Sequence, residues 1–228
     1  MKNFLLVLLL SIGFIANISA QSDEFDKLNY ITADLLAPTA SYAPRYEIGY
    51  YRHLDDQWIV GAEVGYGNYA TTINFAADGK WIEKNYQSFS IAPEIKYILN
   101  PARKTRKFIS AELFYIYHSD KFSNRSYTNT NFTTTSSYDR ADYQRDKFGL
   151  NFNYGMIINF SNSVGLIPKI GAGVKVRNVQ FSNAENLNVT NLNDYQVSTP
   201  HFNSRHLEVE GVITRFNFNF EIQFFYKF

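Results

Sequence analysis

The stretch FNFNFEIQFFYKF, residues 216–228, places an aromatic or aliphatic side chain at every second position. Because side chains alternate between the two faces of a β-strand, this period of two predicts a strand with one apolar and one polar face. A soluble half-buried strand has the same period, but it is usually shorter and less rich in phenylalanine. We therefore expect the apolar face to meet lipid. That face consists of Phe216, Phe218, Phe220, Ile222, Phe224, Tyr226 and Phe228.

The composition is that of a folded and nearly neutral protein. The chain has 228 residues, of which 45% are hydrophobic and 17% aromatic, so it can form a packed structure. Lys and Arg total 22 against 21 Asp and Glu, and this balance argues against nucleic acid as a partner. Cysteine is absent, which excludes disulfides, thiolate metal sites and cysteine nucleophiles. No cofactor is predicted.

The segment MKNFLLVLLLSIGFIANISA, residues 1–20, has the features of a secretory signal peptide. Lys2 precedes an apolar stretch, and small residues lead to Ala20, after which we expect cleavage. Residues 21–27 would then form a short periplasmic segment. No later stretch is apolar enough for a spanning helix, and only helices and closed barrels satisfy the backbone groups in lipid. A membrane location of the mature chain therefore requires a β-barrel.

Alternating segments predict an all-β fold: a single eight-stranded antiparallel transmembrane β-barrel over residues 28–228, with an up-and-down meander. Short and long connections alternate, as tight periplasmic turns and longer extracellular loops do, and an even strand count leaves both termini periplasmic. A soluble secreted β-sandwich is the alternative, but it would leave the aromatic face exposed. The expected strands are 28–37, 44–54, 57–67, 86–99, 107–118, 147–160, 164–177 and 211–228.

The faces opposite the apolar ones carry glycine and charge, and we assign them to the barrel interior. Ten of the twelve glycines fall there, where they would give long neighbouring side chains space. An eight-stranded barrel is only just wide enough for its own side chains, so inward charges are expected to pair and to plug it. Arg45, Arg177 and Arg215 are expected at solvated rims. The predicted lumenal charge network consists of Glu63, Glu94, Lys96, Glu112, Lys169 and Glu221.

Residues 28–228 resemble the small eight-stranded outer-membrane barrels of the OmpA and OmpX type, in a version like those of the Bacteroidetes. The last strand carries the resemblance most specifically, because Phe224, Tyr226 and Phe228 match the alternating signal that the outer-membrane insertion machinery reads. The resemblance implies the outer membrane of a Gram-negative bacterium, contacts with its lipids and assembly by that machinery. Pro93 and Pro168 interrupt predicted strands, so bulges are expected beside them.

Groups for catalysis are weakly represented. His118, Ser119 and Asp120 are adjacent, so on a strand they point to opposite faces and cannot form a triad. Some barrels of this kind modify lipid A, but the His-x-Ser pair of the deacylases is absent here. A further group in the last connection lacks the spacing of a metal site. It consists of His201, His206, Glu208 and Glu210.

We therefore expect a non-enzymatic integral outer-membrane protein with a structural or surface-interaction role through long extracellular loops. The polar stretch over residues 123–146 is rich in Ser, Thr, Asn and Tyr and is expected to be either a binding loop or a solvated tip. The alternatives are a small channel or ligand-uptake protein and, third, a lipid-A-modifying enzyme.

Overall fold

The computed structural model describes residues 29–72, 82–103, 105–131, 133–191 and 208–228. The predicted signal peptide, the periplasmic segment and His201 and His206 lie outside these ranges. None of the helices in the described part is long and apolar enough to cross a membrane. The elements are β1 (Tyr30–Asp34), α2 (Ala37–Ala40), β2 (Tyr46–His53), β3 (Trp58–Asn68), the 3-10 helix η1 (Tyr69–Thr71), β4 (Gln87–Ile98), β5 (Thr105–Thr128), β6 (Thr134–Asn159), β7 (Val164–Glu185), β8 (Asn188–Asn191) and β9 (Gly211–Lys227).

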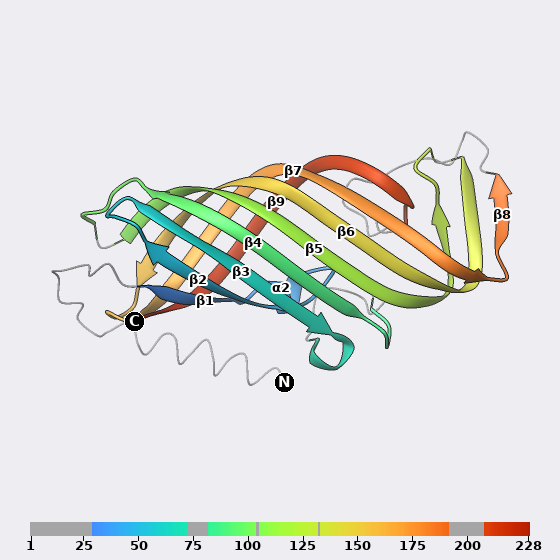
Figure 1. Ribbon diagram of the computed structural model, residues 1–228, viewed down its shortest axis with the longest axis horizontal. Coiled ribbons are helices and arrows are strands. Elements are labelled where there is room, and N and C mark those ends of the chain that lie inside the picture. Colours follow the sequence, from blue (N-terminus) through green and yellow to red (C-terminus); the bar gives the residue numbers. More distant parts are fainter. Residues whose placement is uncertain (1–28, 73–81, 104, 132, 192–207) are drawn as a thin grey trace.

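Eight strands close into one antiparallel ring (Figure 1). The order around the ring is β1, β2, β3, β4, β5, β6, β7 and β9, and β9 pairs with β1 to complete it. Each strand of the ring pairs with the next one along the chain, so the predicted all-β class, the strand number and the meander order are confirmed. The short β8 lies outside the ring and pairs with the far end of β6.

Three strands run beyond their predicted ends. The sequence predicts a loop over residues 119–146, but β5 continues to Thr128 and β6 begins at Thr134, so most of that stretch is a paired hairpin. β7 also continues past its predicted end. The alternation is hard to recognise in this hairpin because its inner face mixes apolar residues with polar ones such as Asp120 and Ser136, both of which are buried. We call residues 119–146 and 178–191 the extension; it projects from one end of the ring (Figure 1).

β1, in contrast, is shorter than predicted. The Asp34 carboxylate accepts the backbone N–H groups of Leu36 at 2.5 Å and Ala37 at 2.7 Å and so turns the chain into α2. The last backbone hydrogen bond between this segment and β9 joins Leu35 to Ile222 at 2.9 Å. From Ile222 back to its start, β9 pairs with β7 alone among the described strands. We call this stretch of β9 its unpaired edge.

The two prolines do not shift the register, so the predicted bulges beside them are wrong. Pro93 lies opposite Ala62, and Pro168 lies opposite Ile222, in ladders that run without a shift. On its other side each proline interrupts a ladder, between β4 and β5 for Pro93 and between β6 and β7 for Pro168. Both ladders resume in the same register. The missing N–H therefore faces one neighbour only and is tolerated without a bulge. The register shift between β6 and β7 lies instead in the extension, between Arg140 and Asp142.

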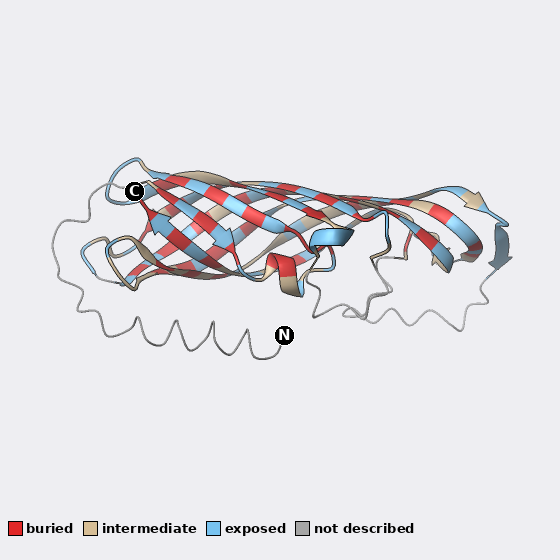
Figure 2. Cartoon of the chain, turned by 90° about the horizontal axis from the view of Figure 1, so that it is seen from below, coloured by how far each residue is buried: buried red, intermediate tan, exposed pale blue. Residues whose placement is uncertain are grey.

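The burial of the ring is inverted relative to a soluble domain. Along β9 the outward Phe218 is 74% exposed, whereas the adjacent inward Asn217 is 4% exposed. Exposed and buried residues alternate in this way around the whole ring (Figure 2). All predicted apolar residues of β9 and Phe228 lie on this outer face; Ile222 is half-buried and the others are exposed. Charged and amide side chains thus fill the interior, and aromatic side chains cover the outside.

An apolar layer closes the interior near the end where β1 begins. It consists of Tyr30, Tyr51, Ile59, Ile98, Phe108, Ile157, Ile167 and Phe225, all buried. Glycines make room for its rings: a Cβ on Gly61 would lie 2.3 Å from Cδ1 of Tyr51, and one on Gly155 would lie 2.4 Å from Cζ of Phe108. These inward glycines therefore accommodate aromatic rings, whereas the sequence suggested room for lysine and arginine. We call this layer the floor.

Candidate functional site

Lys169 is the centre of a buried ion-pair network next to the floor. Its Nζ atom lies 2.5 Å from Glu112, 2.9 Å from Glu221 and 3.1 Å from Glu94. These partners stand on β5, β9 and β4, so one lysine of β7 joins strands from several sides of the ring. Three carboxylates around one ammonium, which is 2% exposed, form a charge-dense centre that water barely reaches.

Lys96 and Tyr51 complete the network on the other side of Glu94. The Lys96 ammonium lies 3.4 Å from Glu94 and 3.6 Å from the centroid of the Tyr51 ring. The Tyr51 hydroxyl donates to Glu63 at 2.5 Å and lies 2.8 Å from Glu94. The structure therefore brings all six predicted charges together, with Glu63 joined through Tyr51. Ion pairing, a cation–π contact and a bridging hydroxyl offset part of the cost of removing these charges from water.

Neutral side chains satisfy the remaining carboxylate oxygens. Ser110 donates to Glu94 at 2.6 Å, and Asn151 donates to Glu112 at 2.9 Å. Gln223 donates to Glu63 as well. The sequence prediction named only charged residues and missed these donors together with Tyr51. The signal was present, because each of these residues occupies an inward position of an alternating strand.

Arg45 is also part of the interior, where it pairs with Glu47. Its Nε atom lies 2.8 Å from Glu47 and 2.9 Å from the hydroxyl of Ser90. Arg45 and Arg177 are both buried, so the prediction that they lie at solvated rims is wrong. For Arg45 the reason is that its guanidinium points into the interior, where it also donates to the backbone carbonyl of Ala43 at 3.0 Å. Arg215 is half-buried.

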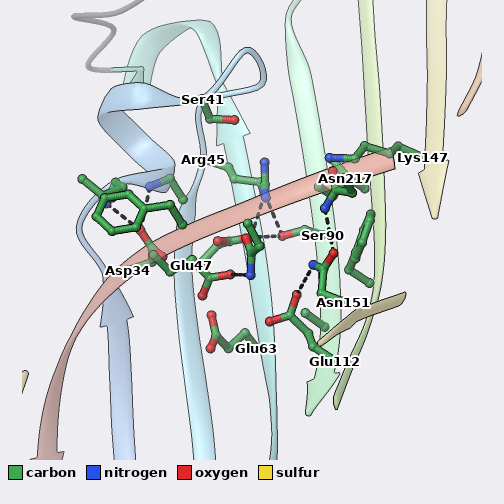
Figure 3. A pocket seen from close by; sticks show the side chains of 18 of the residues that line it. Asp34, Ser41, Arg45, Glu47, Glu63, Ser90, Glu112, Lys147, Asn151 and Asn217 are labelled. Carbon is green, nitrogen blue, oxygen red and sulfur yellow. Dashed lines mark hydrogen bonds and ion pairs between the residues drawn. The ribbon is translucent and has the colours of Figure 1, made fainter. Parts of the chain in front are cut away.

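A cavity of about 360 Å³ lies beside the network, between α2 and the unpaired edge of β9. Its walls include Leu36 and Ala40 on one side and Phe218 and Phe220 on the other. Figure 3 shows the polar side chains that converge on it, among them the hydrogen-bonded series Asn217, Asn151 and Glu112. The labelled polar residues of the wall are Asp34, Ser41, Arg45, Glu47, Glu63, Ser90, Glu112, Lys147, Asn151 and Asn217. The cavity is thus polar inside, and outward-facing phenylalanines contribute to its wall.

The extension has a small core of its own. Buried Phe122, Tyr138, Ala141, Tyr143 and Val179 form this core on the concave face. Tyr127 and Phe181 stack against each other beside it, with ring centroids 4.4 Å apart and planes inclined by 6°. This packing holds the extended hairpin in a defined shape, although the sequence suggested a polar loop.

Ion pairing at the surface also ties the strands of the extension together. Asn183 donates to Asp142 at 2.7 Å, and the Lys121 ammonium lies 3.2 Å from the same carboxylate. These contacts lower the pKa of Asp142 below its usual value of 3.8, the hydrogen bond from Asn183 having the larger effect. Asn183 has a left-handed backbone with φ of 52° close to the register shift, so this pair marks an irregular bend of β7.

The histidine candidates do not form a catalytic site in the described part of the chain. His118 is buried edge-on between Tyr86 and Tyr143, with centroid distances of 5.0 and 5.1 Å. Neither ring nitrogen has a hydrogen-bond partner there, and Asp120 instead accepts the backbone N–H of Glu83 at 2.6 Å. Among the described residues no group of three metal-ligating side chains converges.

No protein-family model, curated protein or solved structure matches the chain. Function is therefore inferred from the chain's own residues and their geometry.

Proposed function

We propose that this protein is an integral outer-membrane β-barrel of the cell envelope, closed to free passage by its interior. It acts without catalysis, through the cavity beside α2 and through the extension on the outer side of the membrane. The predicted signal peptide, the strand count and the aromatic last strand support export, insertion by the outer-membrane machinery and periplasmic termini. Outer-membrane lipids are the proposed partners of its outer face.

The inverted burial is the observation that carries this proposal. An outer face of exposed phenylalanine around an interior with a fully buried Lys96 is unstable in water and favourable in lipid. A closed ring also leaves no open sheet edge within hydrocarbon, provided that the wall is paired or covered. The segment from Leu35 to Arg45 lies across the cavity from the unpaired edge of β9 and contributes Leu36, Ala37 and Ala40 to the cavity wall.

The floor and the network favour a closed barrel and argue against a channel. The floor fills the ring with buried aromatic and aliphatic side chains, and the Lys169 ion pairs cross the ring next to it. An ion that traversed the interior would have to displace both layers. The cavity then serves as a binding cup that ends at these layers.

The extension supports a role at the cell surface. The small core around Phe122 fixes its shape, so it presents a defined surface instead of a solvated loop. Exposed asparagines such as Asn183 and Asn186 on this surface are suited to contacts with another macromolecule.

Heat-modifiable migration and single-channel recording test the proposal together. We expect the detergent-folded protein to migrate differently in SDS before and after boiling, and planar bilayers containing it to show no steady conductance. Identical migration with a helical circular dichroism spectrum would overturn the barrel. Steady conductance by a heat-modifiable protein would replace the closed barrel with the channel alternative, and released fatty acid from purified lipid A would replace it with the enzyme.

A further inference from the structure

A row of cations lies on the inner face of β6, β7 and β9, beyond the ion-pair network. Lys147 on β6 is the direct register partner of Arg177 on β7, and Lys175 on β7 is the register partner of Arg215 on β9. Arg145 follows two positions from Lys147 on the same face. We call these five residues the basic row. Like charges opposite each other on neighbouring strands are unfavourable, so the basic row requires a counter-charge.

Among the described residues, Glu112 is the carboxylate whose charge acts on Lys147, and Glu112 is already paired with Lys169. The carboxylates of the network pair with Lys96 and Lys169, and Glu47 pairs with Arg45. Nε of Arg145 and Nη2 of Arg177 are buried and have no hydrogen-bond partner among the described residues. Both arginines are only 6% exposed. A buried guanidinium nitrogen without a partner is costly, and such nitrogens are expected in a site that binds an anionic ligand.

The cavity reaches the basic row at one member, Lys147. Lys147 lines the cavity, and its ammonium also lies 5.0 Å from the centroid of the Phe114 ring. The cavity wall also includes Phe218 and Phe220, whose side chains point outward. An anionic group can therefore lie at the basic row while an attached acyl chain passes the unpaired edge of β9 to the apolar outer face.

We propose that the basic row and the adjoining cavity bind a phosphate group, either free or as the head group of an anionic lipid. Three arginines and two lysines on one inner face suit a phosphate dianion, because guanidinium groups bind its oxygens in pairs and ammonium groups add charge. The cavity wall itself carries the carboxylates of Asp34, Glu47, Glu63, Glu112 and Glu221, so the anion is expected at the basic row and not deeper in the cavity. This inference rests on the proposed function in one respect: an anionic lipid can be the ligand only if the protein lies in a membrane.

Binding to the detergent-folded full chain tests this site with inorganic phosphate and with dihexanoyl phosphatidic acid as probes. Dihexanoylglycerol, which lacks the phosphate, is the control ligand. The test variant is Lys147→Gln with Arg177→Gln, which removes one opposed pair of the basic row. The matched control is Arg103→Gln with Lys107→Gln, which removes two exposed cations at the other end of the barrel. Calorimetry measures binding, and thermal unfolding with and without each probe measures stabilisation.

We expect saturable binding of at least one phosphate probe, no binding of dihexanoylglycerol, and affinity at least tenfold weaker in the test variant only. Without a probe the test variant should unfold at the same or a higher temperature, since a repulsive pair has been removed. Binding of phosphatidic acid alone assigns a membrane source, and binding of inorganic phosphate assigns a soluble one. No saturable binding, or equal affinity in both variants, would overturn the site. A heat-modifiable protein that binds neither probe would leave the proposed function intact, whereas a phosphate-binding protein that is not heat-modifiable would overturn that function and keep the site.

Discussion

Lys169 on β7 and Glu94 on β4 form an ion pair of 3.1 Å across the interior of the ring, although 75 residues separate them in the sequence. β7 and β4 are not neighbours in the ring, so this contact exists only when the ring is closed. These buried ion pairs therefore depend on closure of the ring. Removing one partner leaves a buried charge unpaired, which is costly.

Lys169→Met is expected to destabilise the folded protein strongly. It removes the shared cation of Glu94, Glu112 and Glu221, and breaking a buried pair in this way costs about 3–5 kcal/mol. Denaturant unfolding in detergent measures the loss. Lys107→Met, on the exposed outer face, is the control and should change stability by less than about 0.5 kcal/mol.

Glu112→Gln added to Lys169→Met should restore part of that stability, because it removes one of the uncompensated carboxylates. An equal or larger loss in the double variant would show that packing, and not charge, dominates at Lys169.

Phe220→Arg is expected to impair insertion into lipid far more than Asn219→Arg. Phe220 is 60% exposed on the outer face, where Arg costs about 2–4 kcal/mol near the membrane midplane. Asn219 faces the interior, lines the cavity and lies beside Glu221, to which it donates at 2.8 Å, so an arginine there finds space and a partner. The fraction of heat-modifiable protein after refolding into liposomes measures insertion. Equal yields of the two variants would mean that Phe220 does not face hydrocarbon.

Gly61→Ala is expected to cost about 1–3 kcal/mol through overpacking of the floor. The added Cβ would lie 2.3 Å from Cδ1 of Tyr51 and 2.4 Å from the backbone oxygen of Tyr50, which has little freedom to move. Ala62→Val adds volume at the next residue but on the outer side, and it should be nearly neutral. The midpoints of denaturant unfolding compare the two, and equal midpoints would contradict close packing at Gly61.

Phe181→Ala is expected to loosen the extension without opening the ring. Phe181 stacks on Tyr127 and packs edge-on against Tyr143 with centroids 5.2 Å apart. Its loss should expose the hairpin to trypsin, which has an exposed site at Arg140, while heat modifiability is kept. Gln180→Ala, at the exposed neighbouring position, is the control. Unchanged proteolysis would show that the strand pairing alone holds the extension.

The sequence was sufficient for the ring because its strands have a period of two with contrasting faces. WIVGAEVGYG and the last strand place apolar residues outward and Gly or charge inward, and the structure has these faces. The six charges of the network could be predicted for the same reason, since inward position alone brings them into a narrow interior. Their individual partners could not, because those depend on how far each strand is shifted around the ring.

The extension and the cavity were harder to predict. In the extension the inner face carries polar residues such as Asp120 and Ser136 among its aromatic ones, so the alternation that marks β5 and β6 elsewhere is weak there. The cavity exists because Asp34 ends β1 through backbone hydrogen bonds, which composition and periodicity do not report. The basic row was missed in part because Arg177 and Arg215 were assigned to solvated rims, whereas the long β6 and β7 extend the wall beside them.

The contact of the outer face with lipid is tested most directly by spin labels on single introduced cysteines, since the chain has no cysteine of its own. Phe220→Cys and Gln144→Cys each place a label at an exposed outward position, one on the ring and one on the extension. In liposomes we predict that the label at 220 is accessible to oxygen and protected from a water-soluble nickel complex, and that the label at 144 shows the opposite. Equal access of the nickel complex to both labels would contradict a ring that spans the membrane.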